Sequence, residues 1–188
     1  MESKAEDGSD RNPGATIETE RLWLRSMRED DLDALLRIFT DRRVMAAFAS
    51  EPFDRAQMQG WLDRNLRHQR EHGYGLFAVI DKADGALIGD CGLEVMEVDG
   101  GREAELGYDF LSAYWGRGLA TEAASAVRDH AFGVLGLTRL VSLIRQGNEA
   151  SRRVAEKVGM QHERDIVRGP IPYWLYAMPA PIPDGQPS

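Results

Sequence analysis

The sequence is poor in cysteine, in metal-ligand patterns and in long apolar runs. Cys91 is its single cysteine, so no internal disulfide bond can form, and the four histidines do not fall at the spacing of metal ligands. No segment approaches the roughly 18 consecutive apolar residues of a membrane span, and none near the N-terminus resembles a signal-peptide core. We therefore expect a soluble cytoplasmic protein without a metal or a membrane partner.

Basic residues are in the minority, with 23 Lys and Arg against 31 Asp and Glu. The net charge of −8 argues against a nucleic-acid-binding protein, because such proteins present a basic surface to phosphate. Residues 112–159 are the exception, since seven basic and four acidic residues give them a charge of +3. This stretch fits either solvated helix faces or a landing site for a polyanionic cofactor.

The length and composition are those of one compact domain. The chain has 188 residues, 43% of them hydrophobic, which is enough for one full core. Residues 1–15 are polar and acidic, which is typical of a disordered tail, and residues 179–188 form a proline-rich C-terminal tail. The domain is therefore expected to cover residues 16–178.

The hydrophobic periodicity predicts an α/β (α+β) domain with a mixed, mostly antiparallel sheet of about seven strands and about four flanking helices. The strands are expected near residues 21–25, 75–80, 86–95, 104–111, 140–144, 161–167 and 173–178. The helices are expected after a capping box at Ser26 and Glu29, at 54–71, at 119–135, and from a cap at Asn148 to Gly159. Residues 44–48 should form an apolar loop, and the strand-helix-strand unit at 104–144 should hold two parallel strands in a right-handed crossover.

The most informative stretch is the glycine-bearing loop at residues 115–121, which lies between a predicted strand and a predicted helix. Main-chain amides and the positive end of the helix dipole attract phosphate at such a position, and Gly116 and Gly118 permit a close approach. A dinucleotide fingerprint would need a third glycine at Thr121, and a Walker loop would need a Lys-Ser/Thr pair, so both are excluded. On this loop alone, a plain tight turn is the alternative.

Four motifs in the same order resemble the GNAT superfamily of N-acetyltransferases, and most of all its branch of ribosomal-protein N-terminal alanine acetyltransferases. Residues 19–25 resemble the opening strand of that branch, Glu-Leu-Gly-Tyr at 105–108 resembles its fourth strand, and Trp-Gly-Arg-Gly-Leu-Ala-Thr-Glu-Ala at 115–123 resembles its phosphate loop. Residues 148–160 resemble its fourth helix, Asn-x-x-Ser-x-x-x-x-Glu-Lys-x-Gly-Phe. The resemblance spans residues 16–178 and implies a GNAT fold, in which two parallel central strands splay apart around acetyl-CoA.

The resemblance also implies where acetyl-CoA lies. The pantetheine arm would pair with main-chain groups near Phe110 and Leu111, and the pyrophosphate would rest on the loop amides. Asn148 would reach the pantetheine or position the acceptor, although a simple helix N-cap fits Asn148 equally well. The implied cofactor-binding residues are Phe110, Leu111, Trp115, Gly116, Arg117, Gly118, Leu119, Ala120, Thr121, Asn148 and Ser151.

Direct transfer of acetyl to an amine needs a base and benefits from an acid. An amine with a pKa of about 8 to 10 is mostly protonated near pH 7, so the transfer needs a base. Glu105 is the candidate for that base. The alternative is that Glu105 is a structural or solvated carboxylate, since Glu103 lies nearby in the sequence and either residue fits a position that faces water. The tyrosine that protonates the CoA thiolate in many relatives is replaced by Ala155. Ser151, one turn earlier, is the substitute candidate, or else a CoA contact or a packing residue. Cys91 is expected to be a buried strand residue.

By analogy with this branch, the acceptor is a protein N-terminus or a small amine, selected by residues 44–53 and the 170–172 loop. The acceptor pocket is expected to include Met45, Phe48, Phe53, Tyr173 and Trp174, although each also suits an ordinary core. A homodimer is compatible with the resemblance. Ala155 suggests an alternative, a non-catalytic acyl-CoA-binding or sensory module of the same fold, and another kind of nucleotide-binding fold is a weaker alternative.

Overall fold

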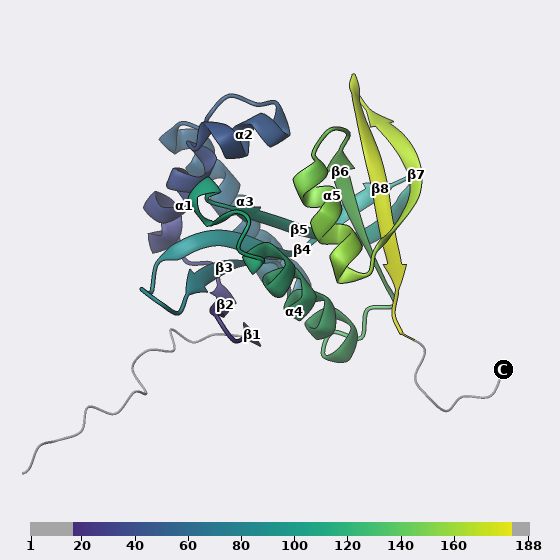
Figure 1. Cartoon of the computed structure of the whole chain (residues 1–188), viewed down its shortest axis with the longest axis horizontal. Coiled ribbons are helices and arrows are strands. Elements are labelled where there is room, and N and C mark those ends of the chain that lie inside the picture. Colours follow the sequence, from purple (N-terminus) through teal and green to yellow (C-terminus); the bar gives the residue numbers. More distant parts are fainter. Residues whose placement is uncertain (1–16, 182–188) are drawn as a thin grey trace, which may run out of the picture.

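A mixed sheet forms the centre of the computed structural model, which describes residues 17–181 (Figure 1). Its strands are β1 (Ile17–Glu18), β2 (Leu22–Ser26), β3 (Leu76–Asp81), β4 (Leu87–Val98), β5 (Gly101–Phe110), β6 (Arg139–Arg145), β7 (Gln161–Arg168) and β8 (Ile171–Pro179). Its helices are α1 (Leu32–Phe39), α2 (Arg42–Phe48), α3 (Arg55–His72), α4 (Leu119–Gly133) and α5 (Glu149–Val158), with 3₁₀ turns η2 (Glu29–Asp31) and η3 (Ser112–Tyr114). The strand order is β1-β2-β3-β4-β5-β6-β8-β7.

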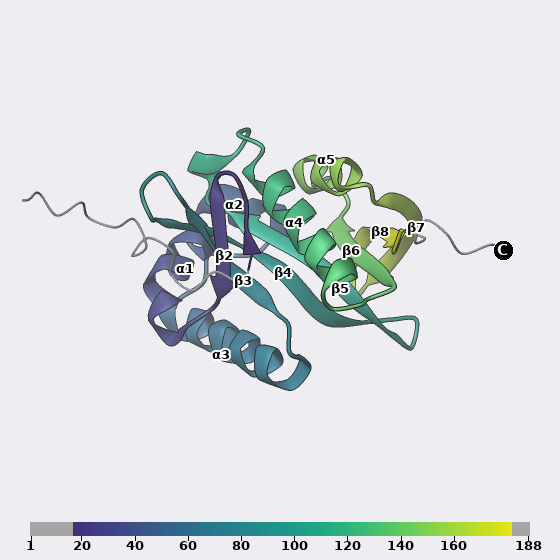
Figure 2. The same ribbon diagram turned by 90° about the horizontal axis from the view of Figure 1, so that it is seen from below.

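The helices cover the two faces of the sheet unequally. Helices α1 to α3 lie on one face, and α4 and α5 lie on the other (Figure 2). On the first face, fully buried Leu35 of α1 and Leu62 of α3 pack in one core with Ala78 of β3. On the second face, Val127 of α4 packs with Leu106 of β5. Burial of apolar surface on both faces therefore fixes the sheet between two layers.

The central strands β5 and β6 are parallel, as the strand-helix-strand pattern predicts, and α4 is the crossover between them. Within residues 17–181, Glu105 opposite Val141 is the single paired position of these two strands. By contrast, β4 and β5 pair continuously from Gly89 and Phe110 to Val98 and Gly101. The sheet thus consists of two antiparallel halves, β1 to β5 and β6-β8-β7, that meet at one short parallel contact.

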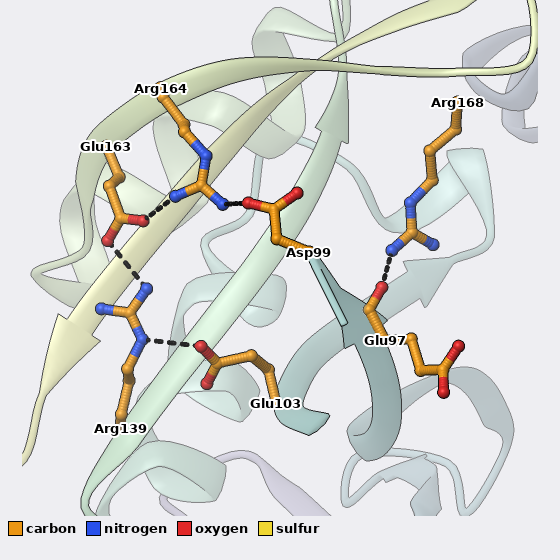
Figure 3. A network of polar contacts seen from close by, with 7 residues as sticks. All are labelled: Glu97, Asp99, Glu103, Arg139, Glu163, Arg164 and Arg168. Carbon is orange, nitrogen blue, oxygen red and sulfur yellow. Dashed lines mark hydrogen bonds and ion pairs between the residues drawn. The ribbon is translucent and has the colours of Figure 1, made fainter. Parts of the chain in front are cut away.

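A network of charged side chains joins the two halves of the sheet at residues that precede the Glu105–Val141 contact along β5 and β6 (Figure 3). Arg139 of β6 reaches Glu103 of β5 at 3.1 Å and Glu163 of β7 at 2.7 Å. Arg164 of β7 also pairs with Glu163 and reaches Asp99 in the turn between β4 and β5. Arg168 donates to the main-chain oxygen of Glu97, so the β4–β5 hairpin is held against β7 at several points.

The predicted apolar loop at residues 44–48 is wrong, because these residues belong to helix α2. Asp41 caps the helix by accepting from the Arg43 N–H at 2.9 Å, and Ala49, in the left-handed conformation with φ of 47°, ends it. Residues 42–48 contain neither glycine nor proline, so nothing in the segment prevents a helix. This extra helix accounts for five α-helices where about four were expected.

The predicted capping box at Ser26 and Glu29 is also wrong. Ser26 is the last residue of β2, and Glu29 begins the turn η2. The capping carboxylate is Asp31, which accepts from the Arg28 N–H at 2.8 Å and pairs with Arg25 at 2.5 Å. A carboxylate buried beside an arginine holds the start of α1 more firmly than an exposed serine would.

The domain expected at residues 16–178 and its two tails stay predictions. The predicted tails, residues 1–15 and most of residues 179–188, lie outside the described residues, although Pro179 itself is the last residue of β8. The short strand β1 brings the number of strands in the described sheet to eight, where about seven were expected. No helix in residues 17–181 is long and apolar enough to cross a membrane.

Candidate active site

A cavity of about 840 Å³ lies beside the residues that follow the parallel contact on β5 and β6. Residues 106–110 of β5 and 142–145 of β6 form two of its walls, because beyond the Glu105–Val141 contact these two strands do not pair with each other within the described chain. The start of α4 and one side of α5 close one end. Apolar side chains of α1 and α2 close the other end, including Phe39 and Val44.

The glycine-bearing loop has free donors at this cavity. Gly116 and Gly118 adopt the left-handed conformation, with φ of 76° and 78°, and α4 begins directly after them. The first helical bond runs from the Glu122 N–H to the Gly118 oxygen, and none of the six amides from Gly116 to Thr121 donates to another group in residues 17–181. Six free amides at a helix N-terminus form a site that suits an anion.

Glu122 holds the first turn of α4 in place from the side away from the cavity. Its carboxylate accepts from the Thr19 hydroxyl at 2.6 Å, from the Arg21 main-chain N–H at 2.9 Å and from Arg21 Nε at 2.7 Å. Partial burial opposes the charged form, but these hydrogen bonds outweigh it and lower the pKa of Glu122. Arg21 also donates to the Arg117 oxygen, so the β1–β2 turn braces the loop.

Two of the residues expected near acetyl-CoA are directed elsewhere. The main-chain N–H of Leu111 donates to the Ile88 oxygen at 2.9 Å, and the Leu111 oxygen accepts from the Tyr114 N–H at 2.9 Å. The guanidinium of Arg117 stacks on the Tyr114 ring, 5.1 Å from its centroid. Neither Leu111 nor Arg117 lines the cavity, and their part in binding acetyl-CoA stays a prediction.

The main-chain groups at the open edge of β5 are instead those of Tyr108 and Phe110. Hydrogen-bonded and non-bonded pairs alternate in an antiparallel ladder, so the Leu111–Ile88 bond directs the main-chain groups of Tyr108 and Phe110 away from β4. The indole Nε1 of Trp115 donates to the Phe110 oxygen at 2.8 Å, which leaves the Phe110 N–H at this edge. Phe110 and Trp115 both line the cavity.

Glu105 is positioned as a weak acid inside the cavity. It is half-buried, and one carboxylate oxygen accepts from the Leu143 N–H of β6 at 3.2 Å. Burial raises its pKa to about 7, although the Leu143 hydrogen bond acts in the opposite direction. A group with this pKa gains and loses a proton readily near neutral pH, as a general base must.

Three polar residues meet at the start of α5. Asn148 caps the helix by accepting from the Ser151 N–H at 3.1 Å, so the N-cap predicted from the sequence is confirmed. The Tyr108 hydroxyl donates to the Ser151 main-chain oxygen at 2.7 Å. All three residues line the cavity, and Ala155, which replaces the tyrosine of many relatives, is fully buried. Tyr108 is a candidate that the sequence reasoning missed, although it ends the Glu-Leu-Gly-Tyr motif.

Four of the five residues expected in the acceptor pocket line the cavity, namely Met45, Phe48, Phe53 and Tyr173. Trp174 does not, and its ring lies 5.9 Å from the Arg152 guanidinium in a shallow hollow elsewhere. Successive side chains of a strand point to opposite faces, so Tyr173 and Trp174 of β8 cannot both face the cavity. Trp61 of α3, which was not predicted, is a further aromatic side chain of the wall.

Charged side chains of both signs line the cavity. Asp90, Glu94 and Asp109 line it in addition to Glu105, and all four carboxylates come from β4 and β5. The basic lining residues are Arg145 of β6 and Arg153 and Lys157 of α5. None of Asp90, Glu94 and Asp109 was predicted, because their common position depends on how β4 pairs with β5.

Comparison with known proteins identifies the family. The model for the acetyltransferase (GNAT) domain matches residues 21–161. The uncharacterized protein YkkB of Bacillus subtilis is 33% identical over 166 residues, which are 88% of this chain and 96% of YkkB. The chain belongs to the GNAT acetyltransferase family, and the prediction of an acyltransferase from its motifs is confirmed.

More distant relatives agree with this assignment. Spermidine N(1)-acetyltransferase of Escherichia coli (strain K12) is 26% identical over 146 residues, 77% of this chain and 75% of that protein. The crystal structure of an acetyltransferase from Agrobacterium tumefaciens matches with a TM-score of 0.75 at 30% identity, over 86% of this chain and 92% of that one. The ribosomal-protein-S5-alanine acetyltransferase from Vibrio fischeri shares the fold, with a TM-score of 0.70 at 22% identity over 90% and 98% of the two chains.

Proposed function

We propose that this protein transfers an acetyl group from acetyl-CoA to a primary amine, of a small molecule or of a protein N-terminus, in a ternary complex. The observation that carries the proposal is one cavity bordered by the free amides of residues 116–121 and by Glu105. A non-catalytic module of the same fold would need the loop but not a carboxylate with a pKa near 7. The position of Glu105 therefore favours catalysis.

The donor fits the part of the cavity beside α4 and α5. Amides from Gly116 to Thr121 would bind the pyrophosphate, and Arg153 and Lys157 of α5 add positive charge to the cavity. The N–H groups of Tyr108 and Phe110 suit the pantetheine amide and the developing oxyanion, because both point to the open edge of β5. Asn148 retains its side-chain amide N–H groups for a contact with pantetheine, since only its oxygen is used in the cap.

The reaction needs an amine that has lost its proton. Glu105 would accept that proton, directly or through a water molecule, from an ammonium bound in the cavity. The amine nitrogen then forms a bond to the thioester carbonyl carbon, the carbon–sulfur bond breaks, and the thiolate leaves. Cys91 takes no part in this scheme, because it is fully buried and burial raises the pKa of its thiol well above the ordinary value.

Proton delivery to the thiolate falls to the hydroxyl groups at α5. Ser151 and Tyr108 are the candidates, since both line the cavity and contact each other through the Ser151 main chain. Burial raises the pKa of Tyr108 far above its ordinary value, so the phenol stays protonated near neutral pH and is a weak acid towards the thiolate, to which it would donate a hydrogen bond. Either hydroxyl would act on the sulfur directly or through water.

The test of the function is acetyl transfer itself. Purified protein is mixed with acetyl-CoA and a panel of small amines and N-terminal peptides, while thiol release and the mass of the products are followed. We expect thiol release that depends on at least one amine and matches an increase of one acetyl group in its mass. Binding of CoA without transfer to any member of a broad panel would instead support the non-catalytic module.

A further inference from the structure

We propose that Asp41 is a positioning residue: it fixes helix α2 to the segment before α4, so that binding of the donor also orders the side of the cavity at which the acceptor binds. This inference rests on the proposed function and specifies how its two substrates are coupled. Asp41 lies between α1 and α2 and does not itself line the cavity. Its carboxylate accepts two main-chain hydrogen bonds, from the Arg43 N–H to Oδ1 at 2.9 Å and from the Ser112 N–H to Oδ2 at 3.0 Å.

The first of these hydrogen bonds caps α2, and the second joins α2 to a distant part of the chain. Ser112 is 71 positions after Asp41 and begins the turn η3, which leads into the glycine-bearing loop. The main-chain N–H of Asp41 donates to the Ile38 oxygen at 3.1 Å, and the Asp41 oxygen accepts from the Met45 N–H at 2.9 Å. One residue therefore connects the end of α1, the start of α2 and the start of η3.

A second contact joins α2 to the other end of η3. The guanidinium of Arg43 lies over the Trp115 ring, 5.2 Å from its centroid. Trp115 directly precedes Gly116, and its indole Nε1 donates to the Phe110 oxygen at the open edge of β5. Because α2 contacts residues on both sides of η3, the position of α2 depends on the position of the glycine-bearing loop.

Helix α2 relies on contacts with the rest of the protein for its position. It has seven residues, and a helix of this length is not stable alone. Val44 and Met45 are buried in one core with Phe39, whereas Phe48 at the end of α2 is 43% exposed. Val44, Met45 and Phe48 all line the cavity, so a shift of α2 would change the shape of the cavity directly.

The donor is the ligand that would order this assembly. The amides of residues 116–121 donate to no other group in residues 17–181, so a pyrophosphate bound by them would restrict the loop. A ligand that restricts one segment lowers the entropic cost of ordering a second segment that is fixed to the first. Donor binding should therefore favour binding of the acceptor against α2, and the acceptor should favour the donor to the same extent.

Asp41 keeps both acceptor oxygens at the pH of the reaction. Partial burial opposes its charged form, but hydrogen bonds from Ser112 and from the Arg43 and Val44 N–H groups outweigh burial and lower the pKa of Asp41. Asparagine caps a helix as well as aspartate does, but its amide has a single acceptor oxygen. In Asp41→Asn the amide nitrogen therefore faces one of the two main-chain donors, and the connection between α2 and η3 is broken whichever donor it faces.

The test is hydrogen–deuterium exchange of the protein with and without CoA, followed by mass spectrometry of its peptides. We expect CoA to slow exchange in residues 44–49 of the parent by at least about 5-fold, the effect of one hydrogen bond of typical net strength, besides slowing it in residues 116–121. In Asp41→Asn, residues 116–121 should stay protected, and the slowing in residues 44–49 should fall below about 2-fold.

Asp54→Asn is the matched control and should behave as the parent does. Asp54 caps α3 in the same way, by accepting from the Gln57 N–H at 2.8 Å, and lies outside the cavity. If Asp41→Asn fails to fold, Asp41→Ser decides, since serine also caps a helix and has one side-chain oxygen.

Kinetics provide a second readout that a loss of stability alone would not change. With the best amine of the panel, Asp41→Asn should raise the KM of the amine by roughly 5-fold to 10-fold, while kcat and the Kd of CoA change by less than about 3-fold. An amine KM within about 2-fold of that of the parent would contradict a role of the fixed helix in acceptor binding.

No slowing of exchange in residues 44–49 of the parent, or equal slowing in Asp41→Asn, would overturn the inference, because CoA would then not act on α2 through Asp41. Exchange needs no acceptor, so it separates this inference from the proposed function. Acetyl transfer without protection of α2 would leave the function standing and remove the coupling. Protection of α2 through Asp41, with no transfer to any amine, would keep the connection and contradict the function.

Discussion

At the scale of single residues, Ser151 and Tyr108 are the candidates that we propose for the acid that Ala155 does not provide. A CoA thiolate has a pKa of about 8 to 9 and leaves without full protonation, so an acid helps without being indispensable. We predict that Ser151→Ala lowers kcat by roughly 10-fold to 10²-fold and leaves CoA affinity largely intact. Tyr108→Phe should behave in the same way if the phenol shares the task.

Steady-state kinetics and calorimetry of CoA binding check this prediction together. If Ser151→Ala loses CoA affinity while kcat at saturating acetyl-CoA stays unchanged, Ser151 is a binding residue. Protonation of the sulfur would then fall to Tyr108 or to water. Ala155→Tyr is informative beside these variants, although Ala155 is fully buried and a phenol there must displace its neighbours.

Sequence reasoning found the residues that contiguous motifs carry and missed those that strand pairing brings together. Glu105 and the loop at 116–121 were predicted because each belongs to a short motif. Asp90 and Asp109 are 19 positions apart, and a shift of one residue in the β4–β5 register would turn one of them to the other face. Trp174 was expected beside Tyr173 for a related reason, since the sequence does not tell which face each residue of β8 presents, and it lies outside the cavity.

At the scale of elements, the loop before α4 is the part of the candidate site whose local structure the sequence predicted best. Its two left-handed glycines and the start of the helix at Leu119 follow directly from local sequence signals. Helix α2 was missed because it has only seven residues and lies in residues 42–52, where the helical pattern of apolar residues is interrupted. Short helices depend on tertiary packing for their stability, which a local pattern does not show.

We predict that acetyl-CoA and CoA raise the melting temperature of the protein and that Gly118→Glu abolishes this increase. A ligand that binds only the native state stabilises it by mass action. The glutamate would bring negative charge to the phosphate site and strain a residue with φ of 78°. Gly136→Glu is the control, because Gly136 has φ of 66° but does not line the cavity. Unchanged CoA affinity in Gly118→Glu would show that the loop does not bind the phosphates.

At the scale of the whole molecule, carboxyl groups whose pKa is raised on folding make the free energy of unfolding fall as the pH rises, whereas an ion-paired carboxylate makes it rise. A carboxyl group whose pKa is raised to about 7 on folding, such as Asp109, stabilises the protein below its unfolded pKa of about 4, and this contribution is lost as the pH rises through 7. Burial lowers the pKa of His68 and of His130, which has the opposite effect below about pH 6.5.

We therefore predict that Asp109→Asn raises the melting temperature relative to the parent at pH 8 and does so much less, or not at all, at pH 5. The asparagine avoids the cost of a buried charge, which the parent bears only at the higher pH. Thermal unfolding of both proteins across this range measures the difference. A constant difference at all pH values would show that Asp109 is ionised throughout and that its pKa is not raised.

The pH dependence of turnover for the parent and for Glu105→Gln tests the central claim, acetyl transfer inside this cavity, most directly. With acetyl-CoA and the best amine of the panel, the rate of the parent should rise as Glu105 loses its proton near pH 7. We predict that Glu105→Gln is slower by roughly 10² near pH 7.5, with CoA affinity unchanged, and that the gap narrows towards pH 10, where solvent deprotonates the amine. A variant as active as the parent at every pH, or an equal loss at every pH, would contradict the role of Glu105 as the base.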